Sequence, residues 1–368
     1  MSSNILYRKL SELESKSLAG IDIPDEYAVP AAIAQIFKGN PSNERRVVPI
    51  QKLGVVDGRI GGAAYSFPTR VCVDGDVVKA CSGGELSVKD WARRSGLGFE
   101  LCDFDADNRD GDHVIFEGAG LSQIAVKVHR FMGFKVFEYP RYIMLLKSRA
   151  LVERKFSGLV QRVLTGVCDF AIVMYSLIIR SFYHLCKKGT SIEAIERDDV
   201  EKLAVVAQFT EDGSRFCEVH DRAWFTWIMN CSYSSERTVE LYLVRQNDKP
   251  IGFFLLKKRF YEQASHRGFK NVNLGSIIEW GCEKGKESLL LWNVVNWVAR
   301  KRRELDAVEF PVCEPFAQRF LKRLGWRQVG NANFCYNIRP NSGFTAPEGM
   351  EDAANWRLRP AMGDAGLS

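Results

Sequence analysis

The stretch GELSVKDWARRSGLG occupies residues 84–98 and places a short strand, a glycine-containing loop and the start of a helix in succession. The loop has the pattern R-x-x-G-x-G, formed by Arg93, Gly96 and Gly98. Two glycines allow positive φ angles and let a ligand approach the backbone closely. Amide groups at a helix N-terminus, with arginines beside them, bind anions such as a polyphosphate. For this stretch taken alone, a plain turn before a helix is the alternative interpretation.

A second motif lies farther along the chain, where Ala125 is followed eight residues later by Gly133 and then by Phe134. Together the two motifs resemble the GNAT superfamily of acetyl-CoA-dependent acyltransferases. In that family R/Q-x-x-G-x-G/A follows the fourth strand, and N-x-x-A-x-x-L-Y-x-x-x-G-F follows the fifth. The resemblance implies a splayed sheet, with the pantetheine arm of CoA entering between these two strands.

The resemblance also implies which residues contact acetyl-CoA, the expected cosubstrate. Backbone amides from Ser95 to Gly98 would hold the pyrophosphate. Ser122 stands where the family has asparagine, and serine caps a helix equally well. The expected CoA-binding residues are Leu86, Ser87, Val88, Arg93, Arg94, Ser95, Gly96, Leu97, Gly98, Ser122 and Ala125.

Two residues are the expected catalytic groups. Glu85, on the strand before the loop, is the candidate base that deprotonates an amine acceptor. His129 stands in place of the family's usual tyrosine and is the candidate acid that protonates the leaving thiolate. Each has a structural alternative, because Glu85 could solvate a strand edge or hold a loop, and His129 could lie on a helix face without a catalytic task.

The back half of the chain repeats landmarks of the front half. Gly61 follows the turn at Asp57-Gly58, and Gly252 follows a similar turn at residues 248–250. The two glycines are 191 residues apart, and the later pair Gly133 and Gly325 is 192 residues apart. The sequence therefore predicts an α/β protein with mixed sheets, in which two GNAT-like domains in tandem are joined by a helical linker. The expected parts are a CoA-binding domain at 1–148, the linker at 149–205, a second domain at 206–340 and a tail at 341–368.

The second copy lacks the glycine loop of the first. Residues 282–287 read CEKGKE at the corresponding place, and their two glutamates would repel a pyrophosphate. We therefore expect this copy to be degenerate and not to bind CoA. The segment His220–Trp227 and the tail residues Trp356–Leu358 with Gly363-Asp364 resemble segments of tandem GNAT proteins of bacteria.

The composition is that of a globular protein, with 46% hydrophobic and 26% charged residues among 368. The net charge of 51 − 45 = +6 is dispersed, and the densest basic run, Arg300–Arg303, stands at an expected helix end, so we expect no nucleic-acid partner. The ten cysteines contain no close pair, which disfavours a metal site and suits a reducing cytoplasm.

One apolar stretch, Val163–Ile179, raises the question of a membrane. It contains Asp169 and is closed by Arg162 and Arg180. Its helical length of roughly 26 Å is shorter than the hydrocarbon core of a bilayer, about 30 Å. We expect a buried or interfacial helix here and no membrane span.

The sequence thus predicts a cytoplasmic N-acetyltransferase that transfers the acetyl group of acetyl-CoA directly to a primary amine of a small molecule or amino sugar, without a metal. One alternative is a catalytically silent CoA-binding or protein-interaction module. Another is an aminoacyl transferase of the FemAB type, which would use charged tRNA. The acceptor and the oligomeric state do not follow from the sequence.

Overall fold

The computed structural model describes residues 3–29, 37–42, 51–103, 113–153, 155–186, 189–210, 214–230, 237–263, 270–340 and 342–361. The chain divides into two compact units, which we call unit 1 and unit 2. Unit 1 comprises Met1–Glu138, Gly213–Trp227 and Ala332–Ser368, and unit 2 comprises Tyr139–Asp212 and Ile228–Asn331. Neither unit is continuous in sequence.

Unit 1 contains a mixed sheet in which one parallel pair is flanked by antiparallel neighbours. Its order is β1 (Ser3–Arg8), β4 (Gln51–Val56), β5 (Arg59–Val73), β6 (Asp76–Val88), β7 (Ile115–Ala119) and the last part of β15 (Arg327–Ile338). β6 and β7 are parallel. A short strand, β10 (Phe216–Glu218), pairs antiparallel with β5, and β2 (Ser17–Leu18) pairs with β3 (Ile21–Asp22).

The predicted turn at Asp57-Gly58 is confirmed as a hairpin turn between β4 and β5, and a second hairpin turn at Asp74-Gly75 joins β5 to β6; all four residues have positive φ. β5 and β6 are long and uninterrupted. β5 continues through residues 67–70, and β6 continues through Gly83-Gly84, although proline and glycine usually interrupt strands. β6 instead absorbs a register shift of one residue, since Ala63 pairs with Ser87 but Tyr65 pairs with Gly84.

The helices of unit 1 that concern the site follow β6 and β7. They are the 3₁₀ helix η3 (Asp90–Ser95), α2 (Leu97–Leu101) and α3 (Gln123–Phe131). Leu97 is fully buried beside Gly61 and Gly62, where an added Cβ at Gly62 would lie 3.3 Å from its side chain. The paired glycines of β5 therefore leave the space that seats the loop against the sheet.

Unit 2 repeats the strand order of unit 1. Its sheet runs β9 (Thr190–Ile195), β11 (Arg237–Gln246), β12 (Lys249–Gln263), β13 (Lys270–Cys282), β14 (Ala307–Pro311) and the last part of β8 (Lys135–Leu145). β13 and β14 are parallel, as β6 and β7 are. β12 and β13 also shift register by one residue, between Leu255 and Leu256. The repeat predicted from the glycine spacing is therefore visible as a repeated topology.

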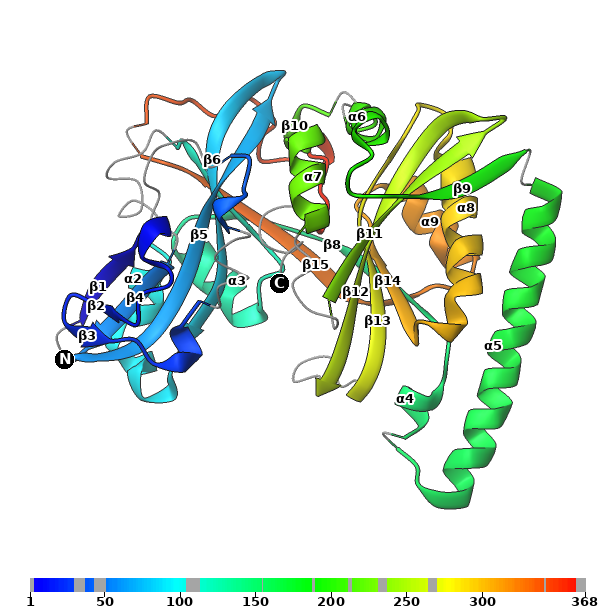
Figure 1. Cartoon of the computed structure of the whole chain (residues 1–368), viewed down its shortest axis with the longest axis horizontal. Helices are drawn as coiled ribbons and strands as arrows, with labels where there is room; N and C mark the ends of the chain where they lie inside the picture. The colour runs from blue at the N-terminus through cyan, green and yellow to red at the C-terminus, as the bar shows by residue number, and fades with distance from the viewer. Residues whose placement is uncertain are drawn as a thin grey trace. The chain divides into compact units, whose positions relative to one another are not determined.

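Five α-helices belong to unit 2 within the part of the chain that the structure describes: α4 (Arg149–Val152), α5 (Gly158–Cys186), α6 (Val200–Gln208), α8 (Glu287–Arg300) and α9 (Pro315–Arg323). A further helix, α7 (Arg222–Asn230), begins in unit 1. The largest core of the molecule lies in unit 2, where α8 packs on the sheet with Leu291, Val295 and Trp297. Figure 1 shows α5 as one long helix on the α8 side of this unit.

The last strand of each sheet comes from a chain segment that follows the other unit's repeat in sequence. The strand after α3 contributes Arg141–Leu145 to the sheet of unit 2, where it pairs with β14. The strand after α9 contributes Phe334–Ile338 to the sheet of unit 1, where it pairs with β7. The expected division of the chain at residues 148, 205 and 340 stays a prediction.

Candidate active site

The glycine loop of unit 1 has the geometry that the sequence predicts. η3 ends at Ser95, Gly96 adopts φ +83°, and α2 begins at Leu97. Nothing lies within 4 Å of a Cβ added at Gly96, and only Val88 lies that close at Gly98. Among the described residues, no hydrogen bond uses the amide groups of Gly96 and Gly98. The loop therefore presents two free amides at a helix start, which suits a phosphate.

The basic side chains beside this loop are exposed. Arg93 forms an ion pair with Asp90 at 2.8 Å, with its side chain 67% exposed, and Arg94 is exposed as well. An exposed ion pair of this kind contributes little to stability. Arg93 can therefore exchange Asp90 for a ligand phosphate at small cost. Ser95 has a structural task, because its hydroxyl donates to the carbonyl oxygen of Ala92 at 2.7 Å.

The parallel strands β6 and β7 pair over only three residues. Their paired residues are Ala80–Ser82 and Ile115–Glu117, after which β6 continues to Val88 without further pairing to β7. This divergence is the place where the family resemblance puts the pantetheine arm. Leu86 and Val88 pack on the core around Leu97, and Ser87 is exposed. The backbone of Glu85 lies in β6, but its side chain is outside the described part of the chain.

The helix after β7 begins as predicted. The Ser122 hydroxyl accepts a hydrogen bond from the Ala125 amide at 3.2 Å and so caps α3. Asn333, which the sequence did not single out, holds the preceding turn: its side chain accepts from the Leu121 amide at 2.7 Å and donates to the Leu121 carbonyl oxygen at 2.9 Å. The predicted helix start is therefore fixed from both sides.

His129 lies on the buried face of α3. Its Nδ1 is 2.8 Å from the Ala125 carbonyl oxygen, and its ring packs edge-on to Phe134. Burial lowers the pKa of His129, so its imidazole is neutral at neutral pH. The residue of unit 2 that corresponds to His129, 192 positions later in the sequence, is Leu321, which is fully buried. The position is a core position in both units, and a role for His129 as an acid stays a prediction.

A buried acidic pair lies beside the diverging strands, and the sequence analysis missed it. Glu117 on β7 is 1% exposed, and its Oε1 accepts a hydrogen bond from the Thr69 hydroxyl at 2.7 Å. Burial, and then the nearby Glu218 carboxylate, raise the pKa of Glu117 well above its usual value. Glu218 is also buried and lies 3.4 Å from Nε2 of His220, whose ring stacks on Trp224. Burial and the neighbouring acid therefore keep the Glu117 carboxyl protonated to higher pH than an ordinary glutamate.

The equivalent carboxylate of unit 2 has a different environment. Glu309 occupies the position of Glu117 on β14, but it accepts a hydrogen bond from Ser276 at 2.6 Å and lies 3.7 Å from the guanidinium of Arg141. A cation stands beside this glutamate, whereas a second acid stands beside Glu117. The acidic pair is therefore a property of unit 1 and not of the repeat.

The loop of unit 2 also differs, as the sequence predicts. Gly285 has φ +84°, much like Gly96, but its amide donates a hydrogen bond to the Glu287 carboxylate at 2.9 Å. In unit 2 the Glu287 carboxylate therefore engages the loop amide, whereas no described residue engages the corresponding amides of unit 1. This contact supports the expectation that the second copy does not bind CoA through its loop.

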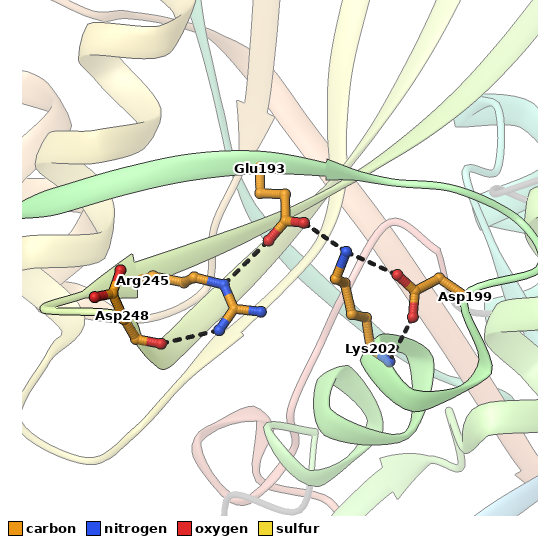
Figure 2. Close-up of polar contacts among 5 residues, drawn as sticks. All are labelled: Glu193, Asp199, Lys202, Arg245 and Asp248. Atoms are coloured by element: carbon orange, nitrogen blue, oxygen red, sulfur yellow. Dashed lines mark hydrogen bonds and ion pairs between the residues drawn. The ribbon is translucent and has the colours of Figure 1, made fainter.

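A second group of charges, shown in Figure 2, is structural. Glu193 on β9 accepts hydrogen bonds from Lys202 of α6 and from Arg245 of β11, and Lys202 also pairs with Asp199 at 2.7 Å. The hydrogen bonds from Lys202 and Arg245 lower the pKa of Glu193, so it stays ionised at neutral pH. Glu193 and Asp199 each have a cation partner, and Arg245 also donates to the backbone carbonyl oxygen of Asp248, which suits a tether between α6 and the sheet rather than acid–base chemistry.

Among the described residues, no group of three or more His, Cys, Asp or Glu side chains could hold a metal ion.

The tail residue Trp356 is buried in unit 1 against Phe216 and Tyr336, whereas Gly363-Asp364 lies outside the described residues.

No protein-family model and no curated protein match the sequence. Solved structures do resemble the fold. N-myristoyltransferase of Saccharomyces cerevisiae with bound myristoyl-CoA has a TM-score of 0.57 at 12% identity, covering 92% of this chain and 80% of that chain. A GCN5-related N-acetyltransferase from Anabaena variabilis has a TM-score of 0.52 at 11% identity, covering 92% and 73%. A probable N-acyltransferase from Enterococcus faecalis has a TM-score of 0.53 at 8% identity, covering 92% and 73%. The predicted GNAT-type α/β fold is thereby confirmed.

Proposed function

We propose that unit 1 is an acyl-CoA-dependent N-acyltransferase that transfers the acetyl group of acetyl-CoA to a primary amine of a small molecule or amino sugar. The observation that carries this proposal is the pair of free loop amides at Gly96 and Gly98, next to the point where β6 and β7 diverge. The solved structures of similar fold include acetyl and myristoyl transferases, which supports CoA thioesters as the class of donor.

The residues present fit a CoA thioester. The amides of Gly96 and Gly98 would bind the pyrophosphate, and Arg93 and Arg94 would add charge-assisted hydrogen bonds. The pantetheine arm would follow the unpaired part of β6 beyond Ser82. The bound thioester supplies the acyl group. This chain's task is to orient it, to exclude water and to accept the proton that the amine loses.

The reaction forms one N–C bond and breaks one C–S bond. The acceptor must lose a proton to become a nucleophile, and the leaving thiolate must gain one. We assign deprotonation of the acceptor to Glu85, on the strand that leads to the loop. Glu117 is buried, and we assign it a positioning role, in which its carboxyl accepts the hydrogen bond from Thr69 across the sheet next to the diverging strands.

The exchange Glu85→Gln tests the proposed base. We expect kcat with acetyl-CoA and a responsive amine to fall by about 100-fold, the usual contribution of general-base catalysis. The affinity for acetyl-CoA should not change, because the residue is assigned to the acceptor. Asp76→Asn, at the exposed far end of the same strand, is the matched control and should keep full activity. An unchanged kcat for Glu85→Gln would remove this residue from the mechanism.

A catalytically silent CoA-binding module is the second candidate, favoured by the burial of His129 where the family has an acid. The two functions differ in a simple experiment. Acetyl-CoA that binds but is not consumed with any member of a broad amine panel would indicate the silent module. A panel of acyl-CoA donors of increasing length would decide which acyl group is used. We propose a cytoplasmic location, in keeping with the cysteines, which are dispersed along the sequence without close pairs.

A further inference from the structure

Helix α5 has two opposite faces of different character. One face packs on unit 2: Ile179 is buried, the Tyr183 hydroxyl donates to Oδ1 of Asn293 at 2.7 Å, and Tyr175 bonds the Leu324 carbonyl oxygen. The opposite face is apolar and exposed to solvent. Its residues recur every three or four positions: Leu159, Val160, Val163, Val167, Phe170, Met174, Leu177, Ile178, Phe182 and Leu185.

This exposed face is unusually large. From Leu159 to Leu185 it extends about 40 Å along the helix. The helix is long and apolar enough to cross a bilayer, with a mean hydropathy of 1.8 in its most apolar window, of which 11% is buried. A continuous apolar surface of this size marks an interaction site, because soluble proteins rarely expose one.

A basic cavity opens on the flank of the same helix. It measures about 760 Å³ and is lined by residues of α5, of the end of α8, of the 3₁₀ helix η5 (Lys301–Arg303) that follows α8, and of the segment before α4. Four cations lie around it, Lys147, Arg180, Arg300 and Arg303, with Asp169 as a lining acid. The Lys147 side chain pairs with Asp306 at 2.8 Å, whereas no hydrogen bond or ion pair engages the side chains of the three arginines within the described chain.

The three arginines are suited to a phosphate group, because guanidinium groups bind phosphate through paired, charge-assisted hydrogen bonds. Their place beside an apolar helix face combines the two features that attach proteins to anionic membranes, an inserted apolar face and adjacent cations. A second copy of this chain is a poorer occupant, since it would bring the same arginines to the face and not the anionic groups that they suit.

We propose that α5 lies in the surface layer of an anionic lipid bilayer, with its apolar face among the acyl chains and a lipid phosphate in the basic cavity. The helix lies along the surface and does not span the bilayer, because its opposite face is fastened to unit 2 by Tyr175 and Tyr183. Asp169 also accepts a hydrogen bond from the Ser148 amide at 2.7 Å, which ties the middle of the helix to unit 2. The proposal does not depend on the proposed activity.

Flotation of the full chain with lipid vesicles tests this proposal. We expect the protein to float with phosphatidylcholine vesicles that contain phosphatidylglycerol, and to float much less with phosphatidylcholine alone. Raising the salt concentration should reduce binding, since the attraction of arginine to anionic lipid is screened. A wild-type protein that stays in solution with both kinds of vesicle would overturn the proposal.

Two variants separate the two parts of the site. The triple exchange V167S/F170S/M174S alters exposed side chains only and should weaken vesicle binding more than about tenfold. R300Q/R303Q should weaken binding to anionic vesicles by about fivefold for each arginine and leave the weak binding to neutral vesicles unchanged. The matched controls are V77S, an exposed valine of unit 1, and R319Q/R323Q, two exposed arginines of α9. Controls that lose as much binding as the test variants would contradict the assignment.

Three further outcomes would overturn the proposal in favour of another occupant. Sedimentation of the wild type as a dimer, and of the triple serine variant as a monomer, would assign the face to a second copy. Resistance of the native membrane-bound protein to alkaline carbonate extraction would indicate a spanning helix. Binding of inorganic phosphate in the cavity without any vesicle binding would assign the arginines to a free phosphate. Circular dichroism would detect a variant that has lost its fold. The comparison of wild-type binding to the two vesicle types would then still test the proposal.

Discussion

Replacing both Gly96 and Gly98 with glutamate will abolish acetyl-CoA binding, with a loss of affinity of at least about 100-fold, or 2.7 kcal/mol. Gly96 adopts φ +83°, a conformation that costs an L-residue about 1–2 kcal/mol. A glutamate at this position therefore strains the loop in its present shape. The two carboxylates also bring negative charge to the amides that would face the pyrophosphate. Calorimetric titration with acetyl-CoA measures the effect.

Unit 2 supplies the matched control for this experiment. Gly285 has φ +84° and open space around it, so Gly285→Glu imposes the same backbone strain and the same kind of charge. Its loop amide is already bonded to Glu287, and we expect acetyl-CoA affinity to be unchanged. If the Gly285 variant lost affinity while the double variant of unit 1 kept it, the CoA site would have to be assigned to the other copy.

Replacing Glu117 with glutamine will stabilise the protein at neutral and alkaline pH. The folded protein holds a proton on Glu117 at pH values where the unfolded chain, with an ordinary pKa near 4.5, has released it. Wild-type stability therefore falls as pH rises above 4.5 and through the raised pKa of the folded state. The slope is about 1.4 kcal/mol for each pH unit. Glutamine keeps an acceptor for Thr69 and cannot ionise in either state, so the slope of stability with pH should shrink and the gain should grow with pH.

Urea unfolding between about pH 5 and pH 8 measures this difference. Glu309→Gln in unit 2 is the control. We expect this exchange to lower the free energy of unfolding, because it removes the carboxylate that Ser276 and Arg141 contact. A Glu117→Gln variant that is less stable than wild type across the range would mean that Glu117 is ionised and paired in the folded protein. A stabilised variant with lowered turnover would show that the acid is kept for function.

The parts of the fold that local chemistry dictates could be predicted from the sequence. The turn at Asp57-Gly58 and the cap at Ser122 each depend on one or two neighbouring residues, and the structure has both. The glycine spacing also predicted the repeated strand order. Pairing between distant segments could not be predicted, because nothing within residues 139–145 indicates that they pair with β14 rather than with β7.

The candidate site divides in the same way. The loop at Gly96 was predictable because positive φ beside a helix start has a clear local signature. The acidic pair was not, since Glu117 and Glu218 are 101 residues apart in sequence and meet only because β10 joins β5. A glutamate in the middle of an apolar strand, IFEGA, was the one signal that could have indicated a buried acid. His129 stands at the position where the family resemblance implies an acid, but the helix face that carries it is buried.

Amide hydrogen exchange of the wild-type protein, with and without acetyl-CoA, is the most direct test of the claim that the loop of unit 1 is the CoA site. We predict that acetyl-CoA slows exchange in the segment that contains Gly96 and Gly98, whose amides no described residue engages, and leaves the segment around Gly285 unchanged. Protection at Gly285 alone, or no protection at either loop at saturating acetyl-CoA, would contradict the account.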